Sequence, residues 1–192
     1  EPDSISYNAA ISTCEKGSEW LSALNALGQV ILKPNQITCN VVIGACGKSA
    51  VWHNASALLM RMPNLFLERD TISYSTAITA CEKGVRWQYA LALLATMRQL
   101  LLAPDTISCN AAMSACEKCT QWQIALVLVT TMVRAVVQPD TISHSAMVSA
   151  CGGCDEWQSA LFLHSVIEWA GMEPHAISCN AAIGACANGG EW

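Results

Sequence analysis

The sequence predicts an all-α protein, an α-solenoid of stacked 35-residue helix–turn–helix repeats. The motif Ile-Ser-Tyr-Asn-Ala-Ala-Ile-Ser begins at Ile5 and returns, with small changes, about every 35 residues. A tryptophan follows each start, with successive spacings of 32, 35, 35, 35 and 35 residues. These tryptophans are Trp20, Trp52, Trp87, Trp122, Trp157 and Trp192. A repeat of this size cannot bury its own apolar face, so neighbouring repeats must stack.

The pattern divides the chain into five repeats, the first of them shortened, and the start of a sixth. The repeats span residues 4–35, 36–70, 71–105, 106–140, 141–175 and 176–192. We number each repeat so that its recurring isoleucine is position 2. Because the chain begins and ends inside the pattern, we expect a longer array, with any targeting segment or further domain outside these residues.

The first half of each repeat has apolar residues at positions 4, 7, 8 and 11. In the third repeat these are Tyr74, Ala77, Ile78 and Cys81. This spacing predicts a helix with one apolar stripe. Thr71 and Ser73 are expected to supply the N-cap oxygens. Glycine stands where the helix should end, at Gly17, Gly84 and Gly189.

The second half has a stripe at positions 17, 20, 21, 24 and 27, which predicts the other helix of the hairpin. In the third repeat it consists of Trp87, Ala90, Leu91, Leu94 and Met97. The small alanine lets the two helices approach closely, and the tryptophan is expected to fill the core beside it. A proline-containing loop closes most repeats, but Pro63 is expected to end the second helix of repeat 2 early.

The eleven cysteines follow the repeat rather than a disulfide framework. Six recur at position 11, namely Cys14, Cys46, Cys81, Cys116, Cys151 and Cys186. Such regular use indicates buried apolar fillers in a reducing compartment. Cys119 and Cys154 create two C-x-x-C pairs, but no histidine pattern completes a zinc site, so we expect neither a metal nor a cofactor.

Charge is unevenly distributed along the chain. Residues 1–134 hold all ten lysines and arginines against nine acidic residues, whereas residues 135–192 hold none against six. A nucleic-acid binder normally has a basic stripe, so the last repeats are poor candidates for phosphate contacts. No apolar stretch is long enough to span a membrane. No catalytic constellation is present either, so we expect neither an enzyme nor a small-molecule substrate.

These features resemble the pentatricopeptide repeat family, whose 35-residue hairpins follow V-T-Y-N-x-L-I, C-x-x-G, A-L-x-L-x-x-x-M and P-D. Repeat 4 shows this pattern at Ile107 to Asn110, Cys116, Ala125-Leu126, Met132 and Pro139-Asp140. The resemblance covers essentially the whole chain, which is similar to an array of the P type. It implies a right-handed superhelix with the first helices lining the concave face.

The resemblance further implies sequence-selective binding of single-stranded RNA, one base per repeat. Position 2 would stack on the bases, through Ile5, Ile37, Ile72, Ile107, Ile142 and Ile177. Position 5 and the closing residue would select each base. The selecting pairs are Asn8 with Asn35, Asn40 with Asp70, Ser75 with Asp105, Asn110 with Asp140, and Ser145 with His175, and Asn180 begins a sixth. By the family's rules Asn with Asp favours U, Asn with Asn favours C or U, and Ser with Asp favours G.

Two questions stay open at this stage. The lysines at position 13 either meet phosphates or are solvated charges favoured by the helix dipole; they are Lys16, Lys48, Lys83 and Lys118. The function is either RNA binding in organellar RNA processing, stabilisation or editing, or a protein–protein interaction scaffold. The family's usual compartments imply a chloroplast or mitochondrion. The small alphabet of Asn, Ser and Asp at the selecting positions favours RNA.

Overall fold

The computed structural model describes residues 13, 17, 19, 21, 22, 25, 34–134, 137–152, 157–169 and 176–188. In this part of the chain the regular secondary structure is helical and contains no strand, which confirms the predicted all-α class. The chain divides into two compact bodies, each described by itself: an N-terminal body, Glu1–Pro104, and a C-terminal body, Asp105–Trp192.

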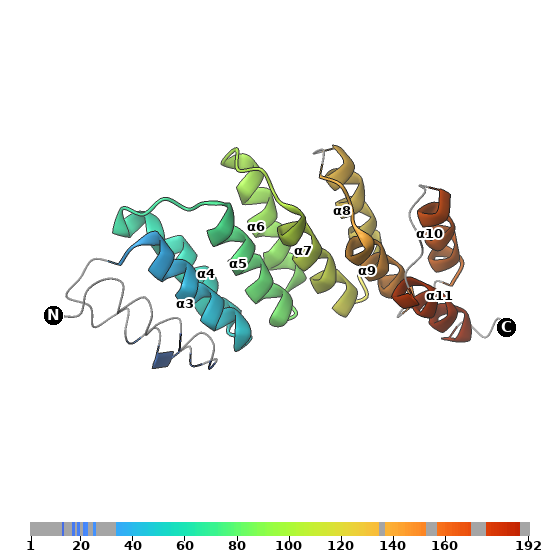
Figure 1. The fold of residues 1–192 in the computed structure, drawn as a ribbon, viewed down its shortest axis with the longest axis horizontal. Coiled ribbons are helices and arrows are strands. Elements are labelled where there is room, and N and C mark those ends of the chain that lie inside the picture. Colours follow the sequence, from blue (N-terminus) through green and yellow to red (C-terminus); the bar gives the residue numbers. More distant parts are fainter. Residues whose placement is uncertain are drawn as a thin grey trace. The chain divides into compact units, whose positions relative to one another are not determined.

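The described part of the N-terminal body contains two complete helical hairpins. The first consists of α3 (Gln36–Lys48) and α4 (Trp52–Arg61), which continues into the short 3-10 helix η1 (Met62–Leu65). The second consists of α5 (Thr71–Lys83) and α6 (Trp87–Gln99). Helix α3 packs side by side with α5, and α4 packs against both (Figure 1). First helices therefore form one layer and second helices another.

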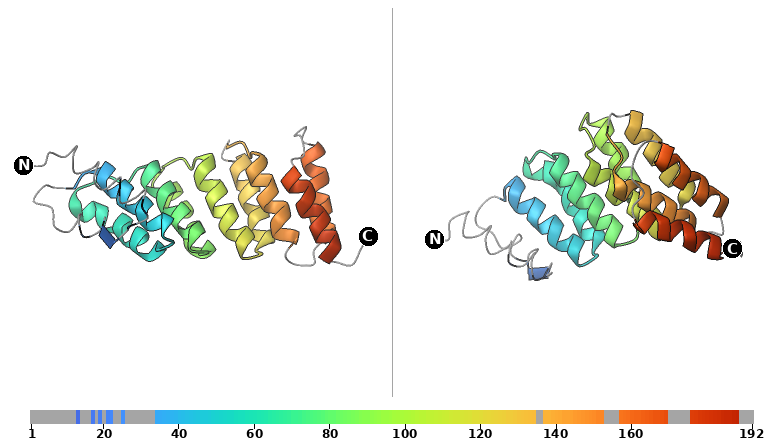
Figure 2. Two further views of the ribbon diagram at one scale, coloured as in Figure 1. Left: turned by 60° about the horizontal axis from the view of Figure 1, so that its bottom comes forward. Right: turned by 45° about the vertical axis from the view of Figure 1, so that its right-hand side comes forward.

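The C-terminal body repeats this arrangement. Its first helices are α7 (Thr106–Lys118), α9 (Thr141–Gly152) and α11 (Ala176–Asn188), and its second helices are α8 (Trp122–Arg134) and α10 (Trp157–Trp169). Helix α9 packs between α7 and α11, while α8 and α10 form the other layer (Figure 2). Stacked two-helix repeats of this kind form a solenoid.

The first helices are buried on more than the predicted stripe. Positions 4, 7, 8 and 11 are buried in repeats 3 and 4, as expected. Position 10 is buried as well, at Ala45, Ala80, Ala115, Ala150 and Ala185. This second row faces the neighbouring first helix: a Cβ atom placed on Gly47 would lie 3.3 Å from the Cβ atom of Ala80. Small residues at these positions let the first helices pack closely.

The tryptophans lie at the edge of the core, which corrects the prediction that they fill it. Trp52, Trp87, Trp122 and Trp157 are half-buried, and Trp20 and Trp192 lie outside the described residues. The Trp52 ring packs 4.4 Å from the Tyr89 ring of the next hairpin, and a Cβ atom on Gly84 would lie 2.5 Å from its Cδ1 atom. This side chain therefore bridges to the following repeat rather than filling its own hairpin.

The ends of α5 and α4 follow the sequence-based expectations. Gly84 is the C-cap of α5, and α4 stops one residue before the turn that contains Pro63. A residue in the left-handed conformation follows one position after the Gly84 position of the repeat, at Ala50, Val85 and Thr120. The next amide closes each turn onto the position-11 carbonyl, as from Arg86 to Cys81 at 2.9 Å.

Position 11 is the buried cysteine site that the repeat predicts. Cys46, Cys81, Cys116 and Cys151 are buried, whereas Cys186 is only half-buried, and Cys14 lies outside the described residues. Burial raises the pKa of Cys46 and Cys81 to about 11 and that of Cys116 to about 12. Across the described residues no three histidine, cysteine, aspartate or glutamate side chains converge as metal ligands would.

These thiols are expected to resist labelling in the folded protein, because a thiol reacts as its thiolate. With limiting maleimide at pH 8, half-buried Cys119 should be modified before Cys46, Cys81 or Cys116. Peptide mapping by mass spectrometry gives the order of modification. Labelling of Cys116 before Cys119 in the native protein would contradict the burial, and the unfolded protein is the control in which all cysteines react.

Tyr74 carries a polar group that the core does not satisfy. The side chain is fully buried, and its hydroxyl has no hydrogen-bond partner in the described part of the chain. Burial raises the pKa of this hydroxyl, and the nearby Arg69 opposes that shift. The Arg69 guanidinium lies 5.8 Å from the ring centroid, a contact that a phenylalanine ring would retain.

The substitution Tyr74→Phe is therefore expected to raise the free energy of unfolding by about 1 kcal/mol, since it removes a buried, unpaired hydroxyl. Urea denaturation followed by circular dichroism measures the change. Tyr89→Phe serves as the matched control, because Tyr89 is exposed and the change there should stay within about 0.5 kcal/mol. Destabilisation by Tyr74→Phe would show that the hydroxyl has a partner after all.

No helix within the described ranges is both long and apolar enough to cross a membrane.

Candidate nucleic-acid interface

Position 2 of the first helices carries an exposed isoleucine wherever the structure describes that side chain. Ile37, Ile72, Ile107 and Ile142 are 64%, 61%, 66% and 60% exposed. The side chains of Ile5 and Ile177 lie outside the described residues. Positions 2 and 5 are three residues apart on a helix, so they share one face. The face that carries the predicted base-selecting residues therefore also carries an apolar side chain that folding leaves in solvent.

The closing residue of each repeat caps the next first helix. Asn35, Asp70 and Asp105 are the N-caps of α3, α5 and α7, and each accepts a hydrogen bond from the backbone N–H three residues on at 2.8 Å. Asp140 accepts the same bond from Ser143 at 2.9 Å. The expectation that Thr71 and Ser73 supply the N-cap oxygens is wrong, because the capping oxygen belongs to Asp70 and accepts the Ser73 backbone N–H.

This capping role changes the meaning of the closing residue. Asp and Asn are preferred N-caps because a short side-chain oxygen reaches the free amides of the first turn. A restricted alphabet at this position therefore has a structural explanation in any helical-repeat protein. It no longer distinguishes an RNA reader from a scaffold, and the distinction falls to position 5.

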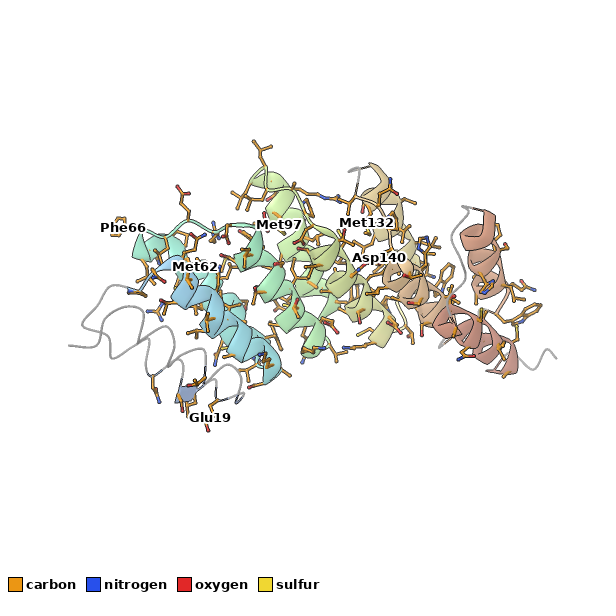
Figure 3. The ribbon with its side chains drawn as sticks, viewed as in Figure 1. Glu19, Met62, Phe66, Met97, Met132 and Asp140 are labelled. Atoms are coloured by element: carbon orange, nitrogen blue, oxygen red, sulfur yellow. The ribbon has the colours of Figure 1, made fainter. Side chains whose placement is uncertain are left out.

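Asn110 is held in place by the repeat that follows it. Its Nδ2 donates to both carboxylate oxygens of Asp140, at 3.1 and 3.0 Å, and its Oδ1 accepts from the Ser143 hydroxyl at 2.5 Å. Burial raises the pKa of Asp140, but the hydrogen bonds from Ser143, Asn110 and Ile142 outweigh it, and the pKa lies below its usual value. The carboxylate is therefore ionised at neutral pH. Figure 3 labels Asp140, which directly precedes α9.

The predicted pair in repeat 2 is linked through a hydroxyl. The Ser73 hydroxyl lies 2.8 Å from Oδ1 of Asn40 and 2.7 Å from Oδ1 of Asp70. The serine at position 3 of one repeat thus contacts both selecting residues of the repeat before it. The structure brings Asn40 and Asp70 together around this hydroxyl, as it does Asn110 and Asp140 around Ser143.

The serines at position 5 behave differently from the asparagines. Ser75 and Ser145 are half-buried, and each donates its hydroxyl to the carbonyl at position 2 of its own helix, at 3.1 Å. Their free lone pairs are left as acceptors for a ligand. Ser75 lies in the N-terminal body and its predicted partner Asp105 in the C-terminal body, so the pair is not described together. Asn180 is exposed, and Asn8 and His175 lie outside the described residues.

The lysines lie at the opposite end of the first helices. Lys48, Lys83 and Lys118 are the last residues of α3, α5 and α7 and are exposed, and Lys16 lies outside the described residues. Lys83 pairs with Glu82 at 3.6 Å. Since a helix rises about 1.5 Å per residue, position 13 lies roughly 16 Å along the axis from position 2. On each of these helices the lysine is therefore well separated from positions 2 and 5.

Sequence reasoning missed the contacts made by position 3. A hydroxyl residue stands there in every repeat, at Ser6, Thr38, Ser73, Ser108, Ser143 and Ser178. Those described are all buried. A recurring polar residue inside an apolar pattern was the available signal, because buried polar groups require hydrogen-bond partners.

The hairpins and their junctions define a class: α-helical repeat proteins built from two-helix units. Within it, the fold is that of pentatricopeptide repeat proteins. The crystal structure of PPR10 from maize superposes with a TM-score of 0.81 and 22% identity over 98% of this chain and 28% of that one. The same protein in complex with an 18-nt psaJ RNA element gives a TM-score of 0.73 at 22% identity, over 95% of this chain and 27% of that one.

The PPR domain of Arabidopsis thaliana protein-only RNase P 1, in complex with tRNA, also superposes. Its TM-score is 0.78 at 11% identity, over 97% of this chain and 100% of that domain. This chain thus spans less than a third of the maize protein but matches the full length of the Arabidopsis domain. No protein-family model matches the sequence, and a search of curated proteins finds no match.

Proposed function

We propose that this chain binds single-stranded RNA with base selectivity, one base per repeat, and acts by binding rather than catalysis. The observation that carries the proposal is the Asn110 amide, held by the Asp140 carboxylate beside an exposed isoleucine at position 2. A scaffold has no need for an oriented amide next to a solvent-exposed apolar side chain. A base requires both, since it stacks on one group and hydrogen-bonds to the other.

The groups left free at position 5 support the base preferences that the family's rules assign. Both Asp140 oxygens lie on one side of Nδ2, so one N–H and one Oδ1 lone pair of Asn110 remain for a ligand. A donor beside an acceptor suits the edge of a pyrimidine, in agreement with U. Ser75 offers acceptor lone pairs, which suit the N–H donors on the edge of guanine.

The similar structures are consistent with this proposal. PPR10 and the Arabidopsis PPR domain were both solved with RNA bound. By the same resemblance we propose an organellar role, in a chloroplast or mitochondrion, in RNA processing, stabilisation or editing. The position-13 lysines are proposed as phosphate contacts only for RNA backbone that runs past the C-terminal ends of the first helices.

A protein-interaction scaffold is the second candidate, favoured by the outer layer. The second helices expose large apolar side chains, among them Tyr89, Val127 and Phe162. A shallow groove between α8 and α10 is lined by Trp122, Leu126 and Phe162, and residues 135–192 have no cation to attract a phosphate. A protein partner would use this layer, whereas RNA would use positions 2 and 5 of the first helices.

Binding of short RNAs to the full 192-residue chain tests the proposal. Fluorescence anisotropy should show a preference for single-stranded RNA that reads pyrimidine, U, G, U from the 5′ end, with the N-terminal repeat at that end. Binding should weaken as salt rises, because counterions are released on phosphate contact. Equal affinity for scrambled RNA would refute base selectivity. Absence of RNA binding, together with capture of a protein by the outer layer, would favour the scaffold.

A further inference from the structure

Two hydrogen bonds cross the repeat junction from the same position and reach the same kind of group. The Ser143 hydroxyl lies 2.5 Å from Oδ1 of Asn110, and the Ser73 hydroxyl lies 2.8 Å from Oδ1 of Asn40. The first contact joins α9 to α7 and the second joins α5 to α3. The same arrangement is therefore found in both bodies.

Helix capping alone does not explain these contacts. At the third helical position a Ser or Thr satisfies the cap by bonding locally, as Ser108 does to Asp105 at 2.5 Å. Ser73 and Ser143 make the corresponding contacts to their caps, at 2.7 and 3.0 Å, and additionally reach the amide of the preceding repeat. The additional contact involves the residue predicted to face the base.

In repeat 4 the hydroxyl hydrogen has one best acceptor. Asp140 already accepts from the Asn110 amide and from a backbone N–H, and its oxygen lies 3.0 Å from the hydroxyl, against 2.5 Å for Oδ1 of Asn110. A serine hydroxyl has a single hydrogen, so the shorter contact is the donated bond. Asp140 then holds the nitrogen of the amide, and Ser143 holds its oxygen.

We propose that the position-3 hydroxyl is a third specificity-determining residue, which acts on the base read by the preceding repeat. Ser143 orients the Asn110 amide through its donated bond. The Ser73 hydroxyl lies 2.7 Å from Asp70 and 2.8 Å from Asn40, so it divides its hydrogen between the two and orients the Asn40 amide less strongly. The side chains themselves are fully buried, so they are positioning residues that do not touch RNA. The inference rests on the proposed RNA binding and adds a residue from the next repeat to each selecting pair.

The test uses the full chain and single-stranded RNAs that differ only at the second or the fourth base, with U or C at each. Ser143→Ala is expected to lower the U-over-C affinity ratio at the fourth base by about three- to tenfold, because one amide hydrogen bond is lost. It should leave the ratio at the second base unchanged. Ser73→Ala should lower the ratio at the second base by a smaller factor, because the Ser73 hydroxyl is shared between Asn40 and Asp70, and should leave the ratio at the fourth base unchanged.

Ser108→Ala is the matched control. It removes the same capping hydroxyl, but position 5 of the preceding repeat is Ser75, which has no amide to orient. Its U-over-C ratios at both bases should equal those of the wild type. Ser143→Thr should restore selectivity, since Thr38 occupies the equivalent buried site in repeat 2. Circular dichroism shows whether each variant folds, and the Ser73 arm still decides the question if Ser143→Ala does not.

The outcomes separate this inference from the function on which it rests. Wild-type ratios in both Ser73→Ala and Ser143→Ala, with RNA binding intact, would overturn the positioning role alone. Loss of selectivity at both bases in every serine variant, including Ser108→Ala, would also overturn it, since that pattern would indicate a non-specific loss of structure in the repeats. If the wild-type chain binds no RNA, the proposed function and the inference fall together.

Discussion

Replacement of Met97 by alanine is expected to lower the free energy of unfolding by about 2–5 kcal/mol, the range for truncating a buried methionine. Met97 is fully buried, as are Met62 and Met132 at the same repeat position (Figure 3). Its carbonyl also accepts the Leu102 N–H at 2.9 Å, which closes the end of α6. Removal of the side chain therefore leaves a cavity where the end of α6 meets the core. Urea denaturation of the full chain measures the loss.

Two matched variants separate cavity formation from other effects. Met97→Leu keeps the volume and should cost less than about 1.5 kcal/mol. Leu101 lies in the turn that follows α6 and is 93% exposed, so the effect of Leu101→Ala should stay within about 0.5 kcal/mol. An equal loss for Met97→Ala and Leu101→Ala would mean that position 27 is not in the core. Because neighbouring repeats share interfaces, the unfolding of repeat 3 should also weaken repeat 2.

The fold was predictable because the repeat supplies the same signal several times. The apolar stripe of Tyr74, Ala77, Ile78 and Cys81 is fully buried, as its spacing requires. The alanine row at position 10 escaped notice because a single stripe describes a helix packed on one side only. First helices in a solenoid have neighbours on several sides, so burial extends around them and the amphipathic pattern weakens.

The tryptophan position shows a different limit. An aromatic residue at a fixed repeat position predicts a buried side chain, but it does not predict the helix against which that side chain packs. The Arg86 guanidinium lies 5.6 Å from the centroid of the Trp52 ring, and the Tyr89 ring packs beside it. Both contacts lie at the junction with the following hairpin. Such contacts depend on how one repeat rotates against the next, and a one-dimensional pattern does not encode that rotation.

The candidate site was predictable only at the level of repeat positions. Asn110 and Asp140 were paired by resemblance, and the structure brings them within hydrogen-bond distance. The N-cap role of Asp70 was not found because the helix was expected to begin later, with Thr71 or Ser73 as its cap. The contact from Ser73 to Asn40 was not found because it depends on the angle at which one first helix meets the next. The roles of these residues toward RNA remain proposals.

The substitution Asn110→Thr is expected to shift the preferred fourth base from U towards G, changing the U-over-G affinity ratio by roughly tenfold or more, since one base-edge contact is worth about 1–3 kcal/mol. Threonine removes the amide that Asp140 holds. A hydroxyl at position 5 donates to its own helix, as Ser75 and Ser145 do, and so offers a base only acceptor lone pairs. Guanine presents adjacent N–H donors to meet them.

Lys83→Ala provides the contrasting variant. A phosphate contact carries no base information, so its loss should weaken all RNAs alike and reduce the salt dependence of binding. Asn110→Thr should instead reorder the four bases at one position only. Stability should fall by about 1 kcal/mol, because the amide–carboxylate bond is lost, and binding is therefore compared at a temperature where both proteins are folded. If the base ranking of Asn110→Thr equals that of the wild type, Asn110 does not read the base; the amide then serves only to join two repeats, and the scaffold with its exposed outer layer becomes the better account of this chain.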